Sequence, residues 1–262
     1  MTDLDALVDD LAAEHAALDA VVANVGDDQW REPTPSPGWS VADQIGHLTY
    51  FDSAAVAAMT DPAAFRTSAA ELVGAWDRVD DLTLHRDLSP PELLAAWRAH
   101  RRRLVEEAGR LSPDARVVWY GPSMSAKSFI TARLMETWAH GQDVVDALGA
   151  DRPATDRLRH IAQLGYITRG WSYANRRLEP PPGQVRVELT GPSGDVWVWG
   201  PEDGDEVVRG PALDFCLVVA QRRHLDDTAL AVTGDGARDW MIKAQIFAGP
   251  PTDGPAPGTR PG

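Results

Sequence analysis

The hydrophobic periodicity of this 262-residue sequence changes at a Pro-Pro-Pro-Gly run that spans residues 180–183. Before the run, apolar residues recur every three or four positions, which is the spacing of amphipathic helices. After the run, apolar residues alternate with polar ones in short segments, which is the spacing of strands. We therefore predict a helical domain over residues 1–179 and a smaller α+β domain over residues 184–248.

Capping signals divide the helical domain into separate helices. A serine or aspartate that can cap the first turn, or a proline within that turn, marks a helix start, and a glycine beyond the last apolar residue marks an end. Residues 60–88 are expected to be irregular or only partly helical. We predict helices over about residues 4–22, 41–59, 90–111, 126–148 and 157–178.

The smaller domain alternates strand patterns with helical ones. Glycine and proline separate the strand patterns, and the turn at residues 191–194 would join the first two strands as a hairpin. The final segment, residues 249–262, cannot bury apolar area, so we expect a disordered tail. We predict strands over residues 185–189, 196–199, 206–209 and 229–233, and helices over residues 211–224 and 237–247.

The charge and the cysteine content of the chain indicate which binding partners and which cellular compartment to expect. The net charge is −14, and a strongly acidic surface repels nucleic-acid phosphates and anionic lipids. No apolar run approaches the roughly 18 residues of a membrane span, and the acidic N-terminus lacks the basic region of a secretory signal. A single cysteine cannot form an internal disulfide. We expect a cytoplasmic protein that acts on a small molecule, without nucleic-acid or membrane partners; a homodimer stays open.

Two histidines and a glutamate form the strongest candidate for chemistry. Glu136 and His140 are four residues apart, so their side chains lie on one helix face, one turn apart. His47, in the middle of another predicted helix, is the best candidate for a third ligand. Two imidazoles and one carboxylate leave coordination positions open, as in a catalytic metal site. The alternative is that Glu136 and His140 make an ordinary contact on the helix surface.

Four neighbouring residues have roles that depend on this site. Asp143 could orient His140 or accept a proton. Arg133 could bind a substrate carboxylate with two hydrogen bonds, although a solvated or paired arginine explains it equally well. Trp39 and Trp138 could shape a pocket for a cosubstrate, with core packing as the alternative for each.

Residues 37–48 and 136–143, the segments that contain His47, Glu136 and His140, resemble the DinB-like superfamily and, more closely, its mycothiol-dependent maleylpyruvate isomerase branch. The resemblance implies an N-terminal four-helix bundle, a smaller C-terminal domain with helices and strands, and a divalent metal on His47, Glu136 and His140. Zinc is the usual metal of that branch, and nickel or iron would suit the same ligands. Residues 191–194 and 210–216 further resemble a subgroup of actinobacterial metal-binding proteins.

Branch membership also implies mycothiol as a cosubstrate. The chain's only cysteine, Cys216, lies in an apolar run, and a buried thiol of that kind is inert. A divalent cation favours the thiolate of an arriving thiol, which could add to a conjugated double bond for isomerisation or take part in S-transfer. Two alternatives stay open. One is a hydrolase, lyase or cyclase of secondary metabolism that uses no thiol, and the other is a non-enzymatic module that binds metal or ligand.

Overall fold

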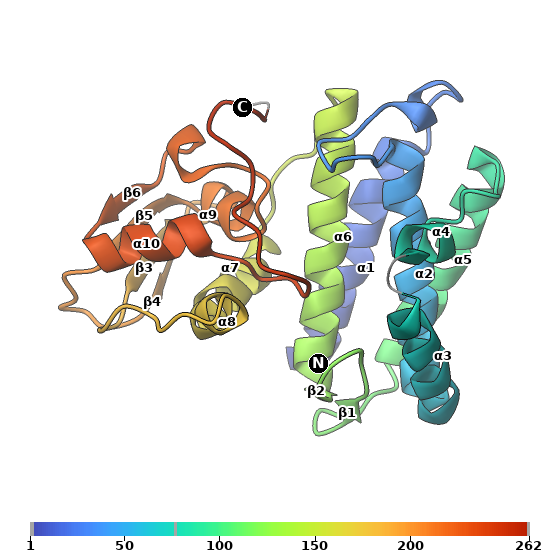
Figure 1. Ribbon diagram of the computed structural model, residues 1–262, viewed down its shortest axis with the longest axis horizontal. Coiled ribbons are helices and arrows are strands. Elements are labelled where there is room, and N and C mark those ends of the chain that lie inside the picture. The colour runs from blue at the N-terminus through green and yellow to red at the C-terminus, as the bar shows by residue number, and fades with distance from the viewer. Residues whose placement is uncertain (1–2, 76–77, 261–262) are drawn as a thin grey trace. The chain divides into compact units, whose positions relative to one another are not determined.

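The chain divides at Arg152, into a first unit of residues 1–152 and a second unit of residues 153–262. The computed structural model in Figure 1 describes residues 3–75 and 78–260. The division comes earlier than the predicted boundary at residues 180–183, because α7 (Leu158–Ile167) and α8 (Arg169–Asn175) pack against helices of the second unit. Helical periodicity shows that a segment has an apolar face, but it does not show which neighbour that face covers.

The first unit is the expected helical bundle. It is formed by α1 (Asp3–Val22), α2 (Val41–Thr60), α5 (Pro90–Ala108) and α6 (Ala126–Leu148), which lie alongside one another in Figure 1. Each of these helices packs against two of the others. In the described part of the chain, none has the length and apolar content needed to span a bilayer. The core cluster takes residues from each bundle helix and from the turn before α2: Leu18, Val22, Trp30, Val41, Ile45, Leu48, Leu93, Trp97 and Val144.

The predicted caps fix the helices that carry the candidate site. At the start of α2, the Ser40 side chain accepts a hydrogen bond from the Asp43 backbone N–H, and the Asp43 carboxylate accepts from the Ser40 backbone N–H at 2.8 Å. At the start of α6, Ser125 accepts from the Ser128 N–H, and Gly149 ends the helix in the left-handed conformation. These reciprocal bonds satisfy N–H groups that a helix start leaves without partners.

The connections between bundle helices are more regular than predicted. Residues 62–74 form α3 (Pro62–Gly74), because Asp61 accepts a hydrogen bond from the Ala64 N–H and Pro62 fits the first turn. A short helix, α4 (Val79–Thr83), follows, and a 3-10 turn, η1 (Gln29–Arg31), precedes α2. Strands β1 (Arg116–Val117) and β2 (Met124–Ser125) pair antiparallel before α6.

The second unit is built on a mixed sheet. Among the described residues, its strands are β3 (Arg186–Thr190), β4 (Val196–Trp199), β5 (Val207–Pro211) and β6 (Ala231–Thr233), in the order β4-β3-β5-β6. Strands β3 and β5 are parallel, and the outer pairs are antiparallel. Helix α9 (Ala212–Val219) packs on α7 and on the sheet, a 3-10 turn, η3 (Leu225–Asp227), leads to β6, and α10 (Asp235–Lys243) follows it. The predicted α+β class is confirmed.

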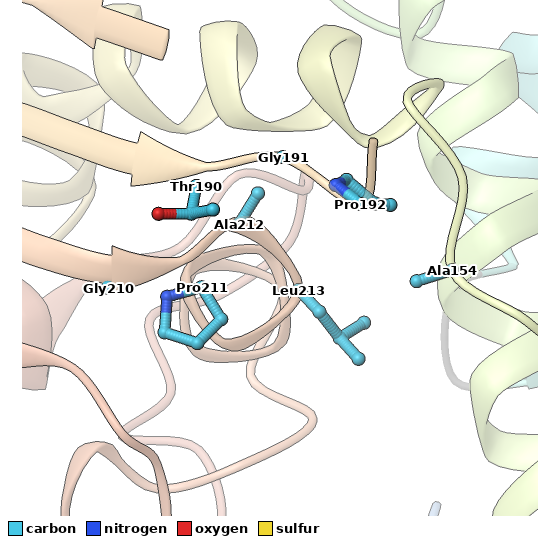
Figure 2. Close-up of a pocket in the computed structure, with 8 residues that line it drawn as sticks. All are labelled: Ala154, Thr190, Gly191, Pro192, Gly210, Pro211, Ala212 and Leu213. Atoms are coloured by element: carbon cyan, nitrogen blue, oxygen red, sulfur yellow. The ribbon is translucent and has the colours of Figure 1, made fainter. Parts of the chain in front are cut away.

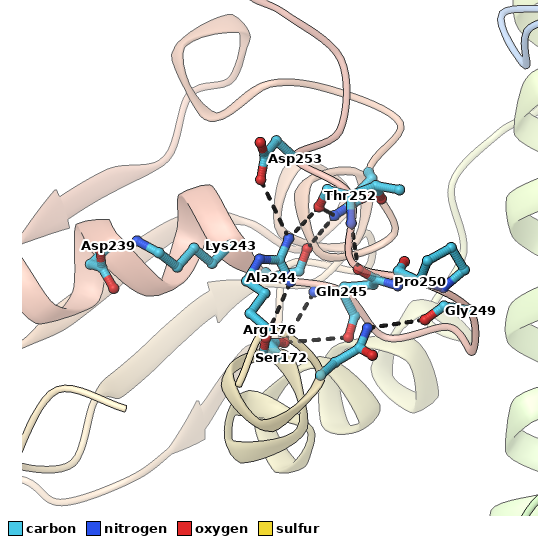
Figure 3. Close-up of polar contacts among 12 residues, drawn as sticks. Ser172, Arg176, Asp239, Lys243, Ala244, Gln245, Gly249, Pro250, Thr252 and Asp253 are labelled. Carbon is cyan, nitrogen blue, oxygen red and sulfur yellow. Dashed lines mark hydrogen bonds and ion pairs between the residues drawn. The ribbon is translucent and has the colours of Figure 1, made fainter. Parts of the chain in front are cut away.

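The predicted disordered tail is ordered where the structure describes it. Figure 3 shows Gly249, Pro250 and Thr252 in hydrogen bonds with side chains of other segments, Gln245 among them. Gln221 donates to the Thr252 carbonyl at 2.8 Å, and Gln245 donates to the Pro250 carbonyl at 3.1 Å. Asn175 donates to the Gly249 carbonyl at 3.1 Å. Composition indicates that this segment has no core of its own, but the amides that bind it lie elsewhere in the sequence. Residues 261–262 of the predicted tail lie outside the described residues.

Gly46 allows a close approach that positions the middle of α2. A Cβ atom at Gly46 would lie 2.0 Å from the carbonyl oxygen of Leu84, which follows α4. That atom belongs to the backbone, so a side chain at position 46 can be accommodated only if α2 or the segment at Leu84 moves. Since His47 is the next residue, this contact also determines where the candidate ligand lies.

Three polar side chains, those of Arg133, Asp52 and His15, are buried together within the bundle. Arg133 on α6 donates to Asp52 on α2 at 2.8 Å, and His15 Nε2 on α1 lies 3.6 Å from the other Asp52 oxygen. The three residues are 3%, 0% and 2% exposed. Burial lowers the pKa of His15 to about 4, although the charge of Asp52 acts in the opposite direction. His15 is therefore neutral in the folded protein at neutral pH.

We expect Gly46→Ala to destabilise the protein by about 1–3 kcal/mol, because the new methyl group collides with backbone. Gly74→Ala is the matched control, since a Cβ there meets no atom within 4 Å. The control should be neutral or slightly stabilising, because alanine favours helix. Chemical denaturation of the two variants measures the difference. Equal free energies of unfolding would show that the contact at Leu84 does not constrain α2.

Acidification should destabilise the bundle through His15. The folded state keeps His15 neutral down to about pH 4, whereas the unfolded chain protonates it near its ordinary value of 6.5. The unfolded state therefore binds more protons across this window, and stability falls as the pH is lowered. His15 should contribute up to about 1.4 kcal/mol per pH unit. Denaturation of metal-free protein at pH 7, 6 and 5 should show a shallower pH dependence for His15→Gln than for the wild type; parallel curves would contradict this assignment.

Candidate metal centre

The bundle brings together the three residues singled out in the sequence. His47 lies on α2, and Glu136 and His140 lie on α6. Glu136 Oε2 is 3.1 Å from His140 Nε2 and 3.8 Å from His47 Nε2. One ligand atom from each residue lies within 4.8 Å of the others, and no other group of three or more such residues in the described ranges meets this criterion. The predicted meeting of His47 with the Glu136–His140 pair is thus present in the structure.

The three side chains are partly accessible. Their side-chain exposures are 18% for His47, 23% for Glu136 and 12% for His140. A closed structural site would bury its ligands on every side, whereas these remain reachable from solvent. The arrangement is therefore suited to binding an ion that keeps a coordination position for another molecule.

Burial and mutual contact set the charge states of two of these groups. Burial, assisted by the neighbouring His140, lowers the pKa of His47 to about 3. Burial alone would raise the pKa of Glu136, but its interactions with the neighbouring His140 and His47 outweigh burial and bring that pKa well below its ordinary value. At neutral pH, His47 is neutral and Glu136 is ionised. These are the protonation states in which both side chains can bind a metal.

Aromatic rings enclose the histidines. The Trp39 ring centroid lies 5.2 Å from that of His47 and 5.9 Å from that of His140, and it is nearly parallel to His140. Phe51 lies 4.5 Å from His47 by the same measure. The Trp39 indole N–H donates to Asp80, which holds the ring in place. Trp39 thus lies against both candidate histidines, and its role in a pocket for a cosubstrate stays a prediction.

Trp138 and Arg133 do not show the geometry of substrate-binding groups. Trp138 is 5% exposed, and the Arg152 guanidinium lies over its ring at 5.6 Å, which favours the core-packing alternative. The charge of Arg133 is already paired with the buried Asp52. The structure therefore favours a paired arginine over a substrate-binding one, and the pair lies in the interior of the bundle.

A residue that sequence reasoning missed, Gln44, occupies the position predicted for Asp143. The Nδ1 atom of His140 lies 2.6 Å from Gln44 Oε1. Asp143 instead accepts a hydrogen bond from Ser36 at 3.1 Å. Gln44 precedes His47 by three residues and therefore lies on the same face of α2, which is the signal that could have identified it.

The second unit contributes a separate pocket and the single cysteine. Figure 2 shows the pocket, of about 460 Å³, at the ends of β3 and β5 and the start of α9, with Thr190, Pro211 and Leu213 among its lining residues. Cys216 is fully buried, and burial raises the pKa of its thiol far above the ordinary value. The predicted inertness of this thiol agrees with its burial.

Two proteins of Mycobacterium tuberculosis, from different strains and named as uncharacterized, are 49% identical to this chain over 258 residues, covering 97% of it and 100% of their own length. Two crystal structures have a similar fold at 18% sequence identity. The mycothiol-dependent maleylpyruvate isomerase has a TM-score of 0.56 and covers 84% of this chain and 90% of its own. A histidine-to-alanine mutant of that enzyme has a TM-score of 0.58, with coverages of 89% and 93%.

Family models match both units. A model described as wyosine base formation matches residues 181–233. The model of the mycothiol maleylpyruvate isomerase N-terminal domain matches residues 11–145, a range that includes the bundle, both candidate histidines and Glu136. The chain belongs to the mycothiol maleylpyruvate isomerase N-terminal domain family.

Proposed function

We propose that the protein is a divalent-metal-dependent enzyme that activates a low-molecular-weight thiol, mycothiol, for isomerisation or S-transfer on a small electrophilic substrate. The observation that carries this proposal is the meeting of His47, Glu136 and His140 in a partly exposed position. Family membership supports the choice of thiol, since the similar solved enzymes are named as mycothiol-dependent maleylpyruvate isomerases.

The donor set fits a divalent metal. In a tetrahedral zinc site with bonds of about 2.0–2.1 Å, neighbouring ligand atoms lie roughly 3.3 Å apart. The separations of 3.1 Å and 3.8 Å from Glu136 Oε2 to the two imidazoles bracket that value. Zinc is the metal that we propose first, and nickel or iron would suit the same nitrogen and oxygen donors.

The chain's own residues would divide the work as follows. His47, Glu136 and His140 would hold the metal, which when bound would favour the thiolate form of the cosubstrate. The Trp39 ring lies against the two imidazoles and would form one wall of the site. Asp143 holds the segment before α2 against α6 through Ser36, so we assign it a positioning role instead of proton transfer.

The thiol would come from outside the chain. Cys216 is buried in the second unit, and its raised pKa makes it a poor nucleophile. A reduced thiol cosubstrate is best maintained in the cytoplasm, where we place the proposed activity.

We expect the purified protein to bind one equivalent of zinc. His47→Ala and Glu136→Gln should each weaken zinc affinity by more than the roughly 10- to 100-fold that follows loss of an outer hydrogen-bond partner. His100→Ala, in the same bundle, is the control and should retain the wild-type affinity. Elemental analysis and chelator competition provide the measurement. Unchanged zinc affinity in His47→Ala would remove the ligand assignment and favour a module without this site.

We expect mycothiol to bind the zinc-loaded protein, and to bind it at least roughly tenfold more weakly, about 1.4 kcal/mol, after the metal is removed. Cys216→Ser should bind like the wild type, because the buried thiol takes no part. Isothermal titration of the loaded protein, the metal-free protein and Cys216→Ser tests both expectations. Zinc binding without any affinity for mycothiol would eliminate the thiol from the proposal and favour a hydrolase, lyase or cyclase at the same site.

A further inference from the structure

A chain of hydrogen bonds leads from the backbone of the segment before α2 to His140. The Trp39 carbonyl accepts from the Thr34 hydroxyl at 2.9 Å and from the Thr34 N–H at 2.8 Å. The Thr34 oxygen lies 2.9 Å from the Gln44 amide nitrogen, and the Gln44 amide oxygen lies 2.6 Å from His140 Nδ1. Gln44 is fully buried, so both ends of its amide need partners within the protein.

The direction of this chain is determined at its first member. A backbone carbonyl can only accept, so the Thr34 hydroxyl must donate its one hydrogen to Trp39. Thr34 is then left with lone pairs towards Gln44, and the Gln44 amide must present its NH2 group to them. The Gln44 carbonyl oxygen therefore faces His140, and Nδ1 of His140 must carry a hydrogen to donate to it.

This direction decides which nitrogen of His140 can bind a metal. With the hydrogen on Nδ1, the neutral ring has its lone pair on Nε2. Nε2 is the atom that faces the Glu136 carboxylate at 3.1 Å, so two acceptors point into the same space. Such a pair is stabilised when a cation lies between them. The same hydrogen-bond chain thus prepares Nε2 for the ion assigned to this site.

We propose that Gln44 is a positioning residue that, held by Thr34 and the Trp39 carbonyl, fixes the His140 tautomer in which Nε2 is free to bind the metal. The metal-binding part of this inference rests on the proposed function, whereas the tautomer itself does not. Trp39 thereby interacts with His140 in two ways. Its backbone carbonyl begins the hydrogen-bond chain that ends at Nδ1, and its ring lies nearly parallel to the imidazole.

The tautomer is measured by nitrogen NMR of the metal-free protein at neutral pH, where the correlations between ring nitrogens and carbon-bound hydrogens show which nitrogen is protonated. His140→Gln identifies the signals. In the wild type, Nδ1 should carry a hydrogen. In Gln44→Met, Nδ1 loses its acceptor and Glu136 remains, so the hydrogen should move to Nε2. An unprotonated Nδ1 in the wild type would overturn the proposal.

Thr34 provides a second test that leaves Gln44 in place. Thr34→Val removes the hydroxyl with little change in volume and releases the Gln44 amide to turn, so the Nδ1 hydrogen should again be lost. Thr34→Ser keeps the hydroxyl and should retain the wild-type pattern. Thr49→Val is the matched control, because the Thr49 hydroxyl also donates to a backbone carbonyl on buried α2 but lies outside this chain. If Gln44→Met fails to fold, the Thr34 variants and the wild-type spectrum still decide the question.

Zinc affinity, measured by chelator competition, separates this inference from the proposed function. Gln44→Met and Thr34→Val should bind zinc roughly 10- to 100-fold more weakly than the wild type, and Thr34→Ser and Thr49→Val should match it. If the wild type shows the expected tautomer but binds no zinc, the proposed function fails and the tautomer assignment stands. If zinc binds through His47 while Gln44→Met and Thr34→Val keep both tautomer and affinity, the role of Gln44 is wrong and the metal site stands.

Discussion

The packing of α2 against α6 is the constraint on which the candidate site depends. It places an ionised carboxylate and two imidazoles together in a partly buried position, with one candidate ligand atom from each side chain within 4.8 Å of the others. The absence of a side chain at Gly46 lets the segment at Leu84 lie directly on α2 beside His47. The buried ion pair between Arg133 on α6 and Asp52 on α2 connects the same two helices. The bundle therefore positions the three candidate ligands by backbone contact and by charge pairing between its helices.

The segment that precedes α2 serves the site through several contacts. Thr34 connects to His140 through Gln44, Ser36 binds Asp143, and the Trp39 ring lies against both histidines. Prolines restrict the backbone of this segment, so its polar groups are held ready at little cost in conformational entropy. This proline-containing segment thus supports the proposed metal centre.

The sequence predicts the fold class and the three candidate ligands because both leave local signals. Glu136 and His140 share a helix face by spacing, and Ser40 with Asp43 announces the start of the helix that carries His47. Thr34 leaves no such signal, and the spacing of Gln44 from His47 shows only that the two share a face of α2, since an amide and a hydroxyl gain a specific role only from partners that the fold brings together. The domain boundary predicted at residues 180–183 differs from the observed division at Arg152 for a related reason. An amphipathic pattern in residues 157–178 does not reveal that the helices there pack against α9 and α10.

Buried side-chain amides of the second unit bind the backbone of residues 250–252. Gln221 and Gln245 are 8% and 0% exposed, and the carbonyls at Thr252 and Pro250 satisfy their amides. A shortened version that ends at residue 248 would remove these acceptors and leave each buried amide with fewer hydrogen-bond partners, the Ala244 carbonyl for Gln221 and the Phe247 carbonyl for Gln245. Truncation of the proline-rich end to aid crystallisation would therefore destabilise the second unit. A purification tag is better placed at the N-terminus.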